Sequence, residues 1–267
     1  MSVSKIGIRR CAAVAATAGA VGVCAIVAST AATGQAAPVP RPAHLPSAAR
    51  VRLNILGAAS LSVVFPKIDE FENYTFNGSG ALEADIEQGA PADVYAAANY
   101  KDPEALYTAG LVYKPVEFAT NLLVMIVPKD NPAHIKSVYD ITKPGVKIVV
   151  CNATVPCGDY ASSAFANLGI TAQADANIVS EEDDVTQVVA QIAAGQGDVG
   201  FVYVTDALAA KNKVTPILLP AAAMPHTQDF IAVVKSTPNL AAAQAYVKLV
   251  LSKKGQSILR AAGFGKG

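Results

Sequence analysis

The sequence predicts an α/β protein in which parallel strands alternate with helices. Short apolar runs are followed, again and again, by longer stretches that stop at glycine or proline, and this order is typical of strand–helix units. Hydrophobic residues make up 52% of the 267 residues, so the chain is able to bury a large core. Charged residues make up only 16%, which is unlike the composition of a disordered chain.

The first part of the folded region opens with an apolar run that ends in glycine, which indicates a buried strand at Val51–Gly57. A helix is expected over Leu61–Phe71, with Pro66 either near its first turn or kinking it. The further elements expected here are a strand at Tyr74–Phe76, a helix at Ala81–Gln88, a strand at Asp93–Ala97, a helix at Asp102–Ala109 and the long apolar run Phe118–Val127.

The second part continues the same alternation and is punctuated by Gly169 and Gly195 after two of its helices. Asp183 or Asp184 is expected to cap the start of the second of these helices. The elements expected here are strands at Lys147–Val150, Val199–Val204 and Phe230–Val234, and helices at Tyr160–Leu168, Val185–Ala194, Asp206–Ala210, Leu240–Leu251 and Gly255–Ala262.

The N-terminus has the layout of a secretory signal. Lys5, Arg9 and Arg10 precede an uncharged run rich in alanine and valine, and small residues follow it. We expect residues 1–36 to be a cleaved signal peptide and residues 37–50 to be a proline-rich tether. A permanent membrane anchor is the alternative, because the run is just long enough to span a bilayer. Lipidation at Cys24 is a further alternative, for which the preceding Val23 is a poor fit.

Charge and composition exclude several functional classes. The formal net charge is zero, and the part after residue 36 is slightly acidic because the three basic residues of the signal have no acidic counterpart there. A nucleic-acid-binding protein needs a basic face, so we expect no nucleic-acid partner. The three histidines lie in no metal-binding motif, which argues against a zinc site.

Two cysteines lie beyond the signal, Cys151 and Cys157. An even pair in an exported chain favours a structural disulfide that closes a small loop. Two free buried thiols or a redox pair are the alternatives, and the second is disfavoured because the spacing is not Cys-x-x-Cys.

Four junctions between strands and helices are rich in small polar residues. They are Gly57–Leu61, Asn77–Gly80, Val155–Tyr160 and Glu182–Val185. Each leaves free backbone N–H groups at a helix start, and several such starts that converge would bind an anion without a cation. The plainer interpretation is that each polar residue only caps its helix, as Ser60 is placed to do.

The motifs along the chain resemble those of the periplasmic molybdate-binding proteins of ABC transporters. The similar stretches run from Val51 to Phe264 and include Ala58–Leu61, Phe76–Gly80, Ile86–Asp93, Phe118–Pro128, Asn131-Pro132, Pro144–Lys147, Val155–Gly158, Gly200–Ala207 and Gly263-Phe264. The resemblance implies a type II periplasmic-binding-protein fold with two lobes, mixed but mostly parallel sheets, helices on both faces and a ligand cleft between the lobes. It implies lobe I at residues 51–120 and 229–267, and lobe II at residues 121–228.

The resemblance also implies the ligand and the residues that hold it. The ligand would be molybdate, or tungstate, with no other cofactor. Its oxygens would accept hydrogen bonds from Ser60, Ser79, the backbone N–H groups of Cys157 and Val185, and Tyr203, and no side chain would bind the metal directly. We expect an exported monomer, in the periplasm or at the cell surface, that delivers the anion to a membrane permease. Acidic residues expected on exposed helix faces, where a permease or only solvent would meet them, are Glu70, Glu72, Glu83 and Glu87.

Two alternative functions stay open at this point. The same fold could bind sulfate, another oxyanion or an organic acid, although no arginine lies near the four junctions to pair with a carboxylate. A secreted enzyme is the second alternative, and it would need a general base beside the site hydroxyls. The only nearby acids are Asp159, Asp183 and Asp184, which we interpret as helix caps.

Overall fold

A computed structural model describes residues 50–267. The expected signal peptide and nearly all of the expected tether, and with them Cys11 and Cys24, lie outside the described residues. Within residues 50–267, no helix combines the length and the apolar character that a membrane span requires.

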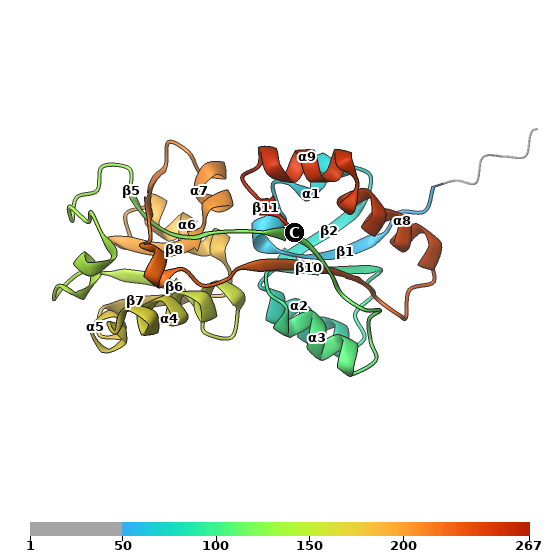
Figure 1. Cartoon of the computed structure of the whole chain (residues 1–267), viewed down its shortest axis with the longest axis horizontal. Coiled ribbons are helices and arrows are strands. Elements are labelled where there is room, and N and C mark those ends of the chain that lie inside the picture. Colours follow the sequence, from blue (N-terminus) through green and yellow to red (C-terminus); the bar gives the residue numbers. More distant parts are fainter. Residues whose placement is uncertain (1–49) are drawn as a thin grey trace, which may run out of the picture. The chain divides into compact units, whose positions relative to one another are not determined.

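The first sheet has six strands in the order β11-β4-β10-β3-β1-β2. Helices α1, α8 and α9 lie on one of its faces, and α2 and α3 lie on the other (Figure 1). We call this sheet and its helices the first lobe. The strands are β1 (Asn54–Ala58), β2 (Asn73–Asn77), β3 (Val94–Ala97), β4 (Val116–Thr120), β10 (Gln228–Val233) and β11 (Gly265–Lys266). The helices are the short 3-10 turn η1 (Ala59–Leu61), α1 (Phe65–Ile68), α2 (Ser79–Glu87), α3 (Lys101–Thr108), α8 (Leu240–Leu251) and α9 (Lys253–Ala261).

The second sheet has five strands in the order β7-β6-β8-β5-β9. Helices α6 and α7 cover one face, and α4 and α5 cover the other (Figure 1). This sheet and its helices form the second lobe. The strands are β5 (Leu123–Pro128), β6 (Ile148–Cys151), β7 (Ile178–Glu182), β8 (Val199–Tyr203) and β9 (Val214–Leu218). The helices are η2 (Val138–Thr142), α4 (Pro156–Leu168), α5 (Thr171–Asp175), α6 (Val185–Ala193), α7 (Val204–Ala209) and η3 (Ala221–Ala223).

The chain passes between the lobes twice, once from β4 to β5 and once from β9 to β10. Asn121 joins the two passages, because its N–H donates to the Thr227 carbonyl and its own carbonyl accepts from the Thr227 hydroxyl. Strand β10 enters the first sheet antiparallel to both β3 and β4, and β5 enters the second sheet antiparallel to β8 and β9. The sheets are therefore mixed as expected, but they are not mostly parallel, because the crossing strands run against their neighbours.

Several predicted elements need correction. The helix expected over Leu61–Phe71 is replaced by η1 and the single turn α1, since Pro66 sits at the start of α1 and provides no N–H for an earlier turn. The apolar run Phe118–Val127 is divided between β4 and β5 by the crossing at Asn121-Leu122. Strands β7 and β9 were not expected from the sequence; both lie at sheet edges, and most of their residues are exposed or half-buried.

One hydrophobic cluster reaches from the first lobe into the second. It includes Ala59 and Leu61 beside β1 and Val185 and Val188 of α6, all of them buried. A separate cluster around Phe165 and Phe201, whose rings meet edge to face at 4.9 Å, fills the other face of the second sheet. The lobes therefore meet through apolar contacts close to the junctions that carry the predicted site residues.

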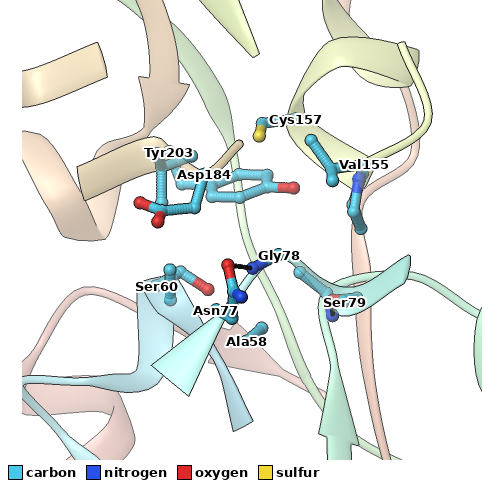
Figure 2. A pocket seen from close by; sticks show the side chains of 13 residues that line it. Ala58, Ser60, Asn77, Gly78, Ser79, Val155, Cys157, Asp184 and Tyr203 are labelled. Atoms are coloured by element: carbon cyan, nitrogen blue, oxygen red, sulfur yellow. Dashed lines mark hydrogen bonds between the residues drawn. The ribbon is translucent and has the colours of Figure 1, made fainter. Parts of the chain in front are cut away.

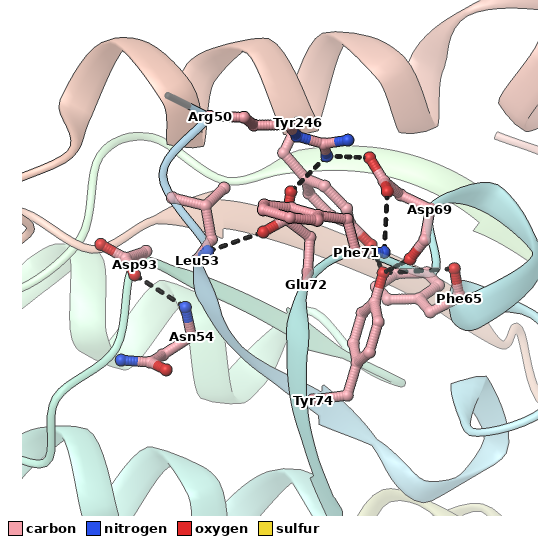
Figure 3. A network of polar contacts seen from close by, with 10 residues as sticks. All are labelled: Arg50, Leu53, Asn54, Phe65, Asp69, Phe71, Glu72, Tyr74, Asp93 and Tyr246. Carbon is pink, nitrogen blue, oxygen red and sulfur yellow. Dashed lines mark hydrogen bonds and ion pairs between the residues drawn. The ribbon is translucent and has the colours of Figure 1, made fainter. Parts of the chain in front are cut away.

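Arg50 fixes the start of the described chain to the first lobe (Figure 3). Its guanidinium pairs with Asp69 and Glu72 and lies 4.5 Å from the centre of the Phe71 ring. The Glu72 side chain is only 2% exposed, and its second oxygen accepts the Leu53 N–H at 2.6 Å. Glu72 is thus a buried partner of Arg50 and not the exposed residue that the sequence suggested.

Removal of this pairing is expected to destabilise the protein. In Arg50→Ala the buried Glu72 carboxylate keeps only the Leu53 N–H, so the free energy of unfolding should fall by about 1–2 kcal/mol, a value reduced because Arg50 itself is half exposed. Arg52→Ala is the matched control, since Arg52 only stacks on Phe71 at 4.7 Å. Urea unfolding of both variants measures the difference, and equal losses would contradict the role assigned to the ion pair.

Candidate functional site

A small pocket lies where the two lobes meet (Figure 2). All five residues predicted as ligand contacts line it. The full lining is Ala58, Ala59, Ser60, Asn77, Gly78, Ser79, Ala98, Val155, Pro156, Cys157, Asp184, Val185 and Tyr203. The first seven come from the first lobe and the other six from the second, and none carries a positive charge.

The position of the pocket follows from strand direction. β1, β2 and β3 are parallel, with Ala58 paired to Asn77, so the residues that follow these strands meet at one edge of the first sheet. β6, β7 and β8 are also parallel, and Cys151 pairs with Glu182. The carboxyl ends of both sets of strands therefore supply the lining, which is the usual place for a ligand in open α/β sheets.

Ser60 lies in η1, immediately after β1. Its hydroxyl is buried and has no hydrogen-bond partner within the described residues, so it does not cap a helix as the sequence suggested. An unpaired buried hydroxyl costs about 1–3 kcal/mol. The arrangement is therefore one that a ligand oxygen would stabilise.

Ser79 is the first residue of α2 and is only 1% exposed. Its hydroxyl oxygen accepts the Ala98 N–H at 3.1 Å, and its carbonyl accepts the Tyr95 hydroxyl at 2.8 Å. Because the Ser79 oxygen is held by a donor, its own hydrogen is left to donate into the pocket.

The second lobe presents two helix starts to the pocket. Pro156 has no N–H, and the N–H groups of Gly158 and Asp159 donate to the Val155 carbonyl. The Cys157 N–H finds no acceptor within residues 50–267, and the same is true of the Val185 N–H at the start of α6. Both groups are available to an anion at positive helix ends.

The expected disulfide joins Cys151 and Cys157, whose Cα atoms are 5.7 Å apart. It links the end of β6 to the first turn of α4. The Cys157 side chain is thus occupied by the disulfide, and its backbone N–H is the group that faces the site.

Tyr203 ends β8, and its phenol oxygen is buried without a partner within the described residues. Burial raises the pKa of Tyr203 well above 10, so the phenol keeps its proton and acts as a donor. The Tyr160 ring packs edge to face against it at 6.3 Å. The Tyr203 N–H donates to the Asp206 carboxylate at 3.0 Å, which fixes the turn from β8 into α7.

Two further lining residues carry polar side chains that the sequence analysis did not assign to the site. The Asn77 amide oxygen accepts the Gly78 N–H at 2.8 Å, so the orientation of its amide group is fixed beside Ser79. Asp184 is the N-cap of α6, as predicted, and its carboxylate accepts from the N–H groups of Thr186 and Gln187 and from both of their side chains. These donors spread its charge away from the pocket. The position of Asn77 directly before the Gly78–Gly80 junction was the available signal.

The site can hold an anion through uncharged donors. Its hydroxyl and N–H groups come from both lobes, and its one acidic lining residue is already hydrogen-bonded to its own helix. Within residues 50–267 no group of three or more His, Cys, Asp or Glu side chains is placed to hold a metal ion.

Comparison with known proteins places the chain in a family. Residues 72–265 match the model of the bacterial extracellular solute-binding proteins, so the chain belongs to that family. The molybdate-binding protein ModA of Mycobacterium tuberculosis is 38% identical over 251 residues, which cover 90% of this chain and 94% of the relative.

Solved structures agree with this assignment. The substrate-binding domain of a putative molybdenum ABC transporter from Clostridium difficile is 30% identical with a TM-score of 0.59, and the match covers 81% of this chain and 99% of that one. The periplasmic molybdate-binding protein of Azotobacter vinelandii shares the fold, with a TM-score of 0.73 at 24% identity over 81% of this chain and all of that chain.

Asp206 should make stability depend on pH. Burial raises the pKa of Asp206 to about 7, above about 3.9 in an unfolded chain. The folded state then binds the proton more tightly, so the contribution of Asp206 is fully present below pH 4 and is lost as pH rises through about 7. Asp206→Asn keeps an oxygen for the Tyr203 N–H and cannot ionise.

Denaturant unfolding of both proteins at about pH 4.5 and about pH 7.5 tests this. Asp206→Asn should gain stability relative to the unchanged protein as pH rises between these values. The same difference at both pH values would show that Asp206 titrates normally.

Proposed function

We propose that this protein is an extracytoplasmic solute-binding protein that captures molybdate, and also tungstate, and delivers it to the permease of an ABC transporter. One observation carries the proposal: the hydroxyls of Ser60 and Tyr203 are buried, have no hydrogen-bond partner among residues 50–267, and reach the same pocket, whose lining holds no cation, from different lobes. The similarity to molybdate-binding proteins of other bacteria supports the choice of ligand.

The assigned contacts are donors only. Ser60, Ser79 and Tyr203 would donate through hydroxyls, and Cys157 and Val185 through backbone N–H groups. Molybdate is a tetrahedral dianion without a proton at neutral pH, so a set made only of donors matches it. Each hydrogen bond to a charged group contributes about 1.5–3 kcal/mol, and five to seven would suffice for micromolar to nanomolar binding after the costs of ordering.

The proposed transport mechanism depends on the hydrogen-bond donors coming from both lobes. Lobe I, at residues 51–120 and 229–267, and lobe II, at residues 121–228, would close on the anion, because only the closed form makes every hydrogen bond. The closed monomer would then dock on the permease outside the cytoplasmic membrane. We propose no enzymatic reaction, since Asp184, the one acid in the pocket lining, is engaged as the N-cap of α6.

Selectivity would come from size and protonation. Sulfate is a smaller tetrahedron and would not reach all the donors at once, whereas phosphate carries a proton that would face a donor. Calorimetric titration of the exported form with molybdate, tungstate, sulfate and phosphate is the direct test. Molybdate and tungstate should bind about equally, and tight binding of sulfate alone would overturn the assignment in favour of a sulfate-binding protein.

Tyr203→Phe removes one donor and no ring contact. Molybdate affinity should fall by about 1–3 kcal/mol, or about 5- to 150-fold. Tyr139→Phe is the control, because it makes the same chemical change in the same lobe at a side chain that is 56% exposed and outside the pocket. Equal affinities for the two variants in the titration would mean that the phenol does not touch the ligand.

Salt should have a small effect on binding. A site that lacks cations loses little attraction when charges are screened, so affinity should change less than about threefold between low salt and about 0.5 M sodium chloride. The same calorimetric titration measures this, and a steep decline would point to a lysine or arginine in the bound form.

A further inference from the structure

Gly78 lies close against the second lobe, beside the pocket. A Cβ atom at this position would lie 2.5 Å from the carbonyl oxygen of Asp183 and 2.7 Å from Cγ1 of Val155, both in the second lobe. Real Cβ atoms do not approach a backbone oxygen so closely, so any side chain here would force the lobes to move apart. Figure 2 shows Gly78 between Asn77 and Ser79, below Val155.

The backbone of Gly78 does not itself require glycine. Its φ of −57° and ψ of 139° are open to every residue, and it is the N-cap of α2, where serine or asparagine is preferred. Gly89, at the other end of α2, shows the opposite case: its φ is +85°, and nothing lies within 4 Å of an added Cβ. The close contact with the second lobe therefore explains why position 78 is glycine, and the backbone conformation at the start of α2 does not.

Gly80 repeats the arrangement less tightly, with an added Cβ 3.0 Å from the Thr154 carbonyl oxygen. The two glycines flank Ser79, so the lobes are in close contact on both sides of a residue whose hydroxyl is assigned to the ligand. Within residues 50–267 no hydrogen bond or ion pair joins Asn77–Gly80 to the second lobe. The contact between Asn77–Gly80 and the second lobe is therefore steric only, and the ligand would supply the attraction that closes the lobes.

We propose that Gly78 is a positioning residue that sets how far the lobes close, and thereby whether Ser79 and Tyr203 reach the same small anion. The inference rests on the proposed function, in which both lobes donate to one oxyanion. A side chain at position 78 would hold the lobes apart and leave the first-lobe donors without their counterparts across the pocket.

The test uses Gly78→Ala and Gly78→Ser. The serine improves the N-cap of α2, so loss of binding in this variant, together with an unchanged or higher unfolding midpoint without ligand, cannot be ascribed to a damaged helix. Gln88→Ala, an exposed change at the far end of α2, is the control. Calorimetry with molybdate should show at least about a tenfold loss for both Gly78 variants and none for the control.

A double-variant comparison separates closure from general damage. If Gly78→Ser keeps Tyr203 from the ligand, then adding Tyr203→Phe should weaken binding by less than about threefold, against about 5- to 150-fold in the unchanged protein. Small-angle scattering should show that saturating molybdate compacts the unchanged protein more than Gly78→Ser. Equal affinity and equal compaction for the two proteins would overturn the inference.

Failure of the proposed function would look different. In that case the unchanged protein would bind none of the oxyanions in calorimetry. Failure of the inference about Gly78 alone would instead leave molybdate binding intact and equally tight in the unchanged protein and in Gly78→Ser.

Discussion

Two buried hydroxyls with no protein acceptor are the constraint on which the site depends. Ser60 follows β1 of the first lobe and Tyr203 ends β8 of the second, and both hydroxyl oxygens are unpaired within the described residues. Buried polar groups are nearly always hydrogen-bonded, so such a pair across a narrow pocket indicates an acceptor that the described part of the chain does not supply. A small oxyanion would satisfy both hydroxyls at once, and it would do so only when the lobes are together.

The surrounding fold keeps these donors and the helix starts aimed at one point. Parallel strands bring the turns after β1 and β2 together in one lobe and those after β6 and β8 in the other. The disulfide ties the first turn of α4 to the end of β6, which holds the Cys157 N–H at the pocket. The approach at Gly78 then allows the two sets to meet. The proposed binding chemistry is thus divided between three side-chain hydroxyls and two backbone N–H groups at helix starts.

The sequence predicted where the pocket lies better than it predicted the elements around it. Small polar residues after apolar runs indicated the junctions, and the family resemblance implied Ser60, Ser79, Cys157, Val185 and Tyr203. All five line one pocket, because the ends of parallel strands meet whatever the details of the helices, and their role as ligand contacts stays a prediction. Local pattern did not predict the break at Pro66 or the edge strands β7 and β9, whose form depends on tertiary contacts. The burial of Glu72 and the contact at Gly78 involve distant segments and leave no local signal.

The buried acids near the pocket differ in how their charge is handled. The Asp184 carboxylate is the N-cap of α6 and accepts four hydrogen bonds from the start of its own helix. Asp229, on the crossing strand β10, is 1% exposed with both carboxyl oxygens unpaired, and burial raises its pKa well above the ordinary value, which favours the neutral acid. A second full negative charge in this low-dielectric region would repel molybdate strongly. The pocket lining therefore holds no cation, burial limits the ionisation of Asp229, and the donors that remain for an anion are uncharged.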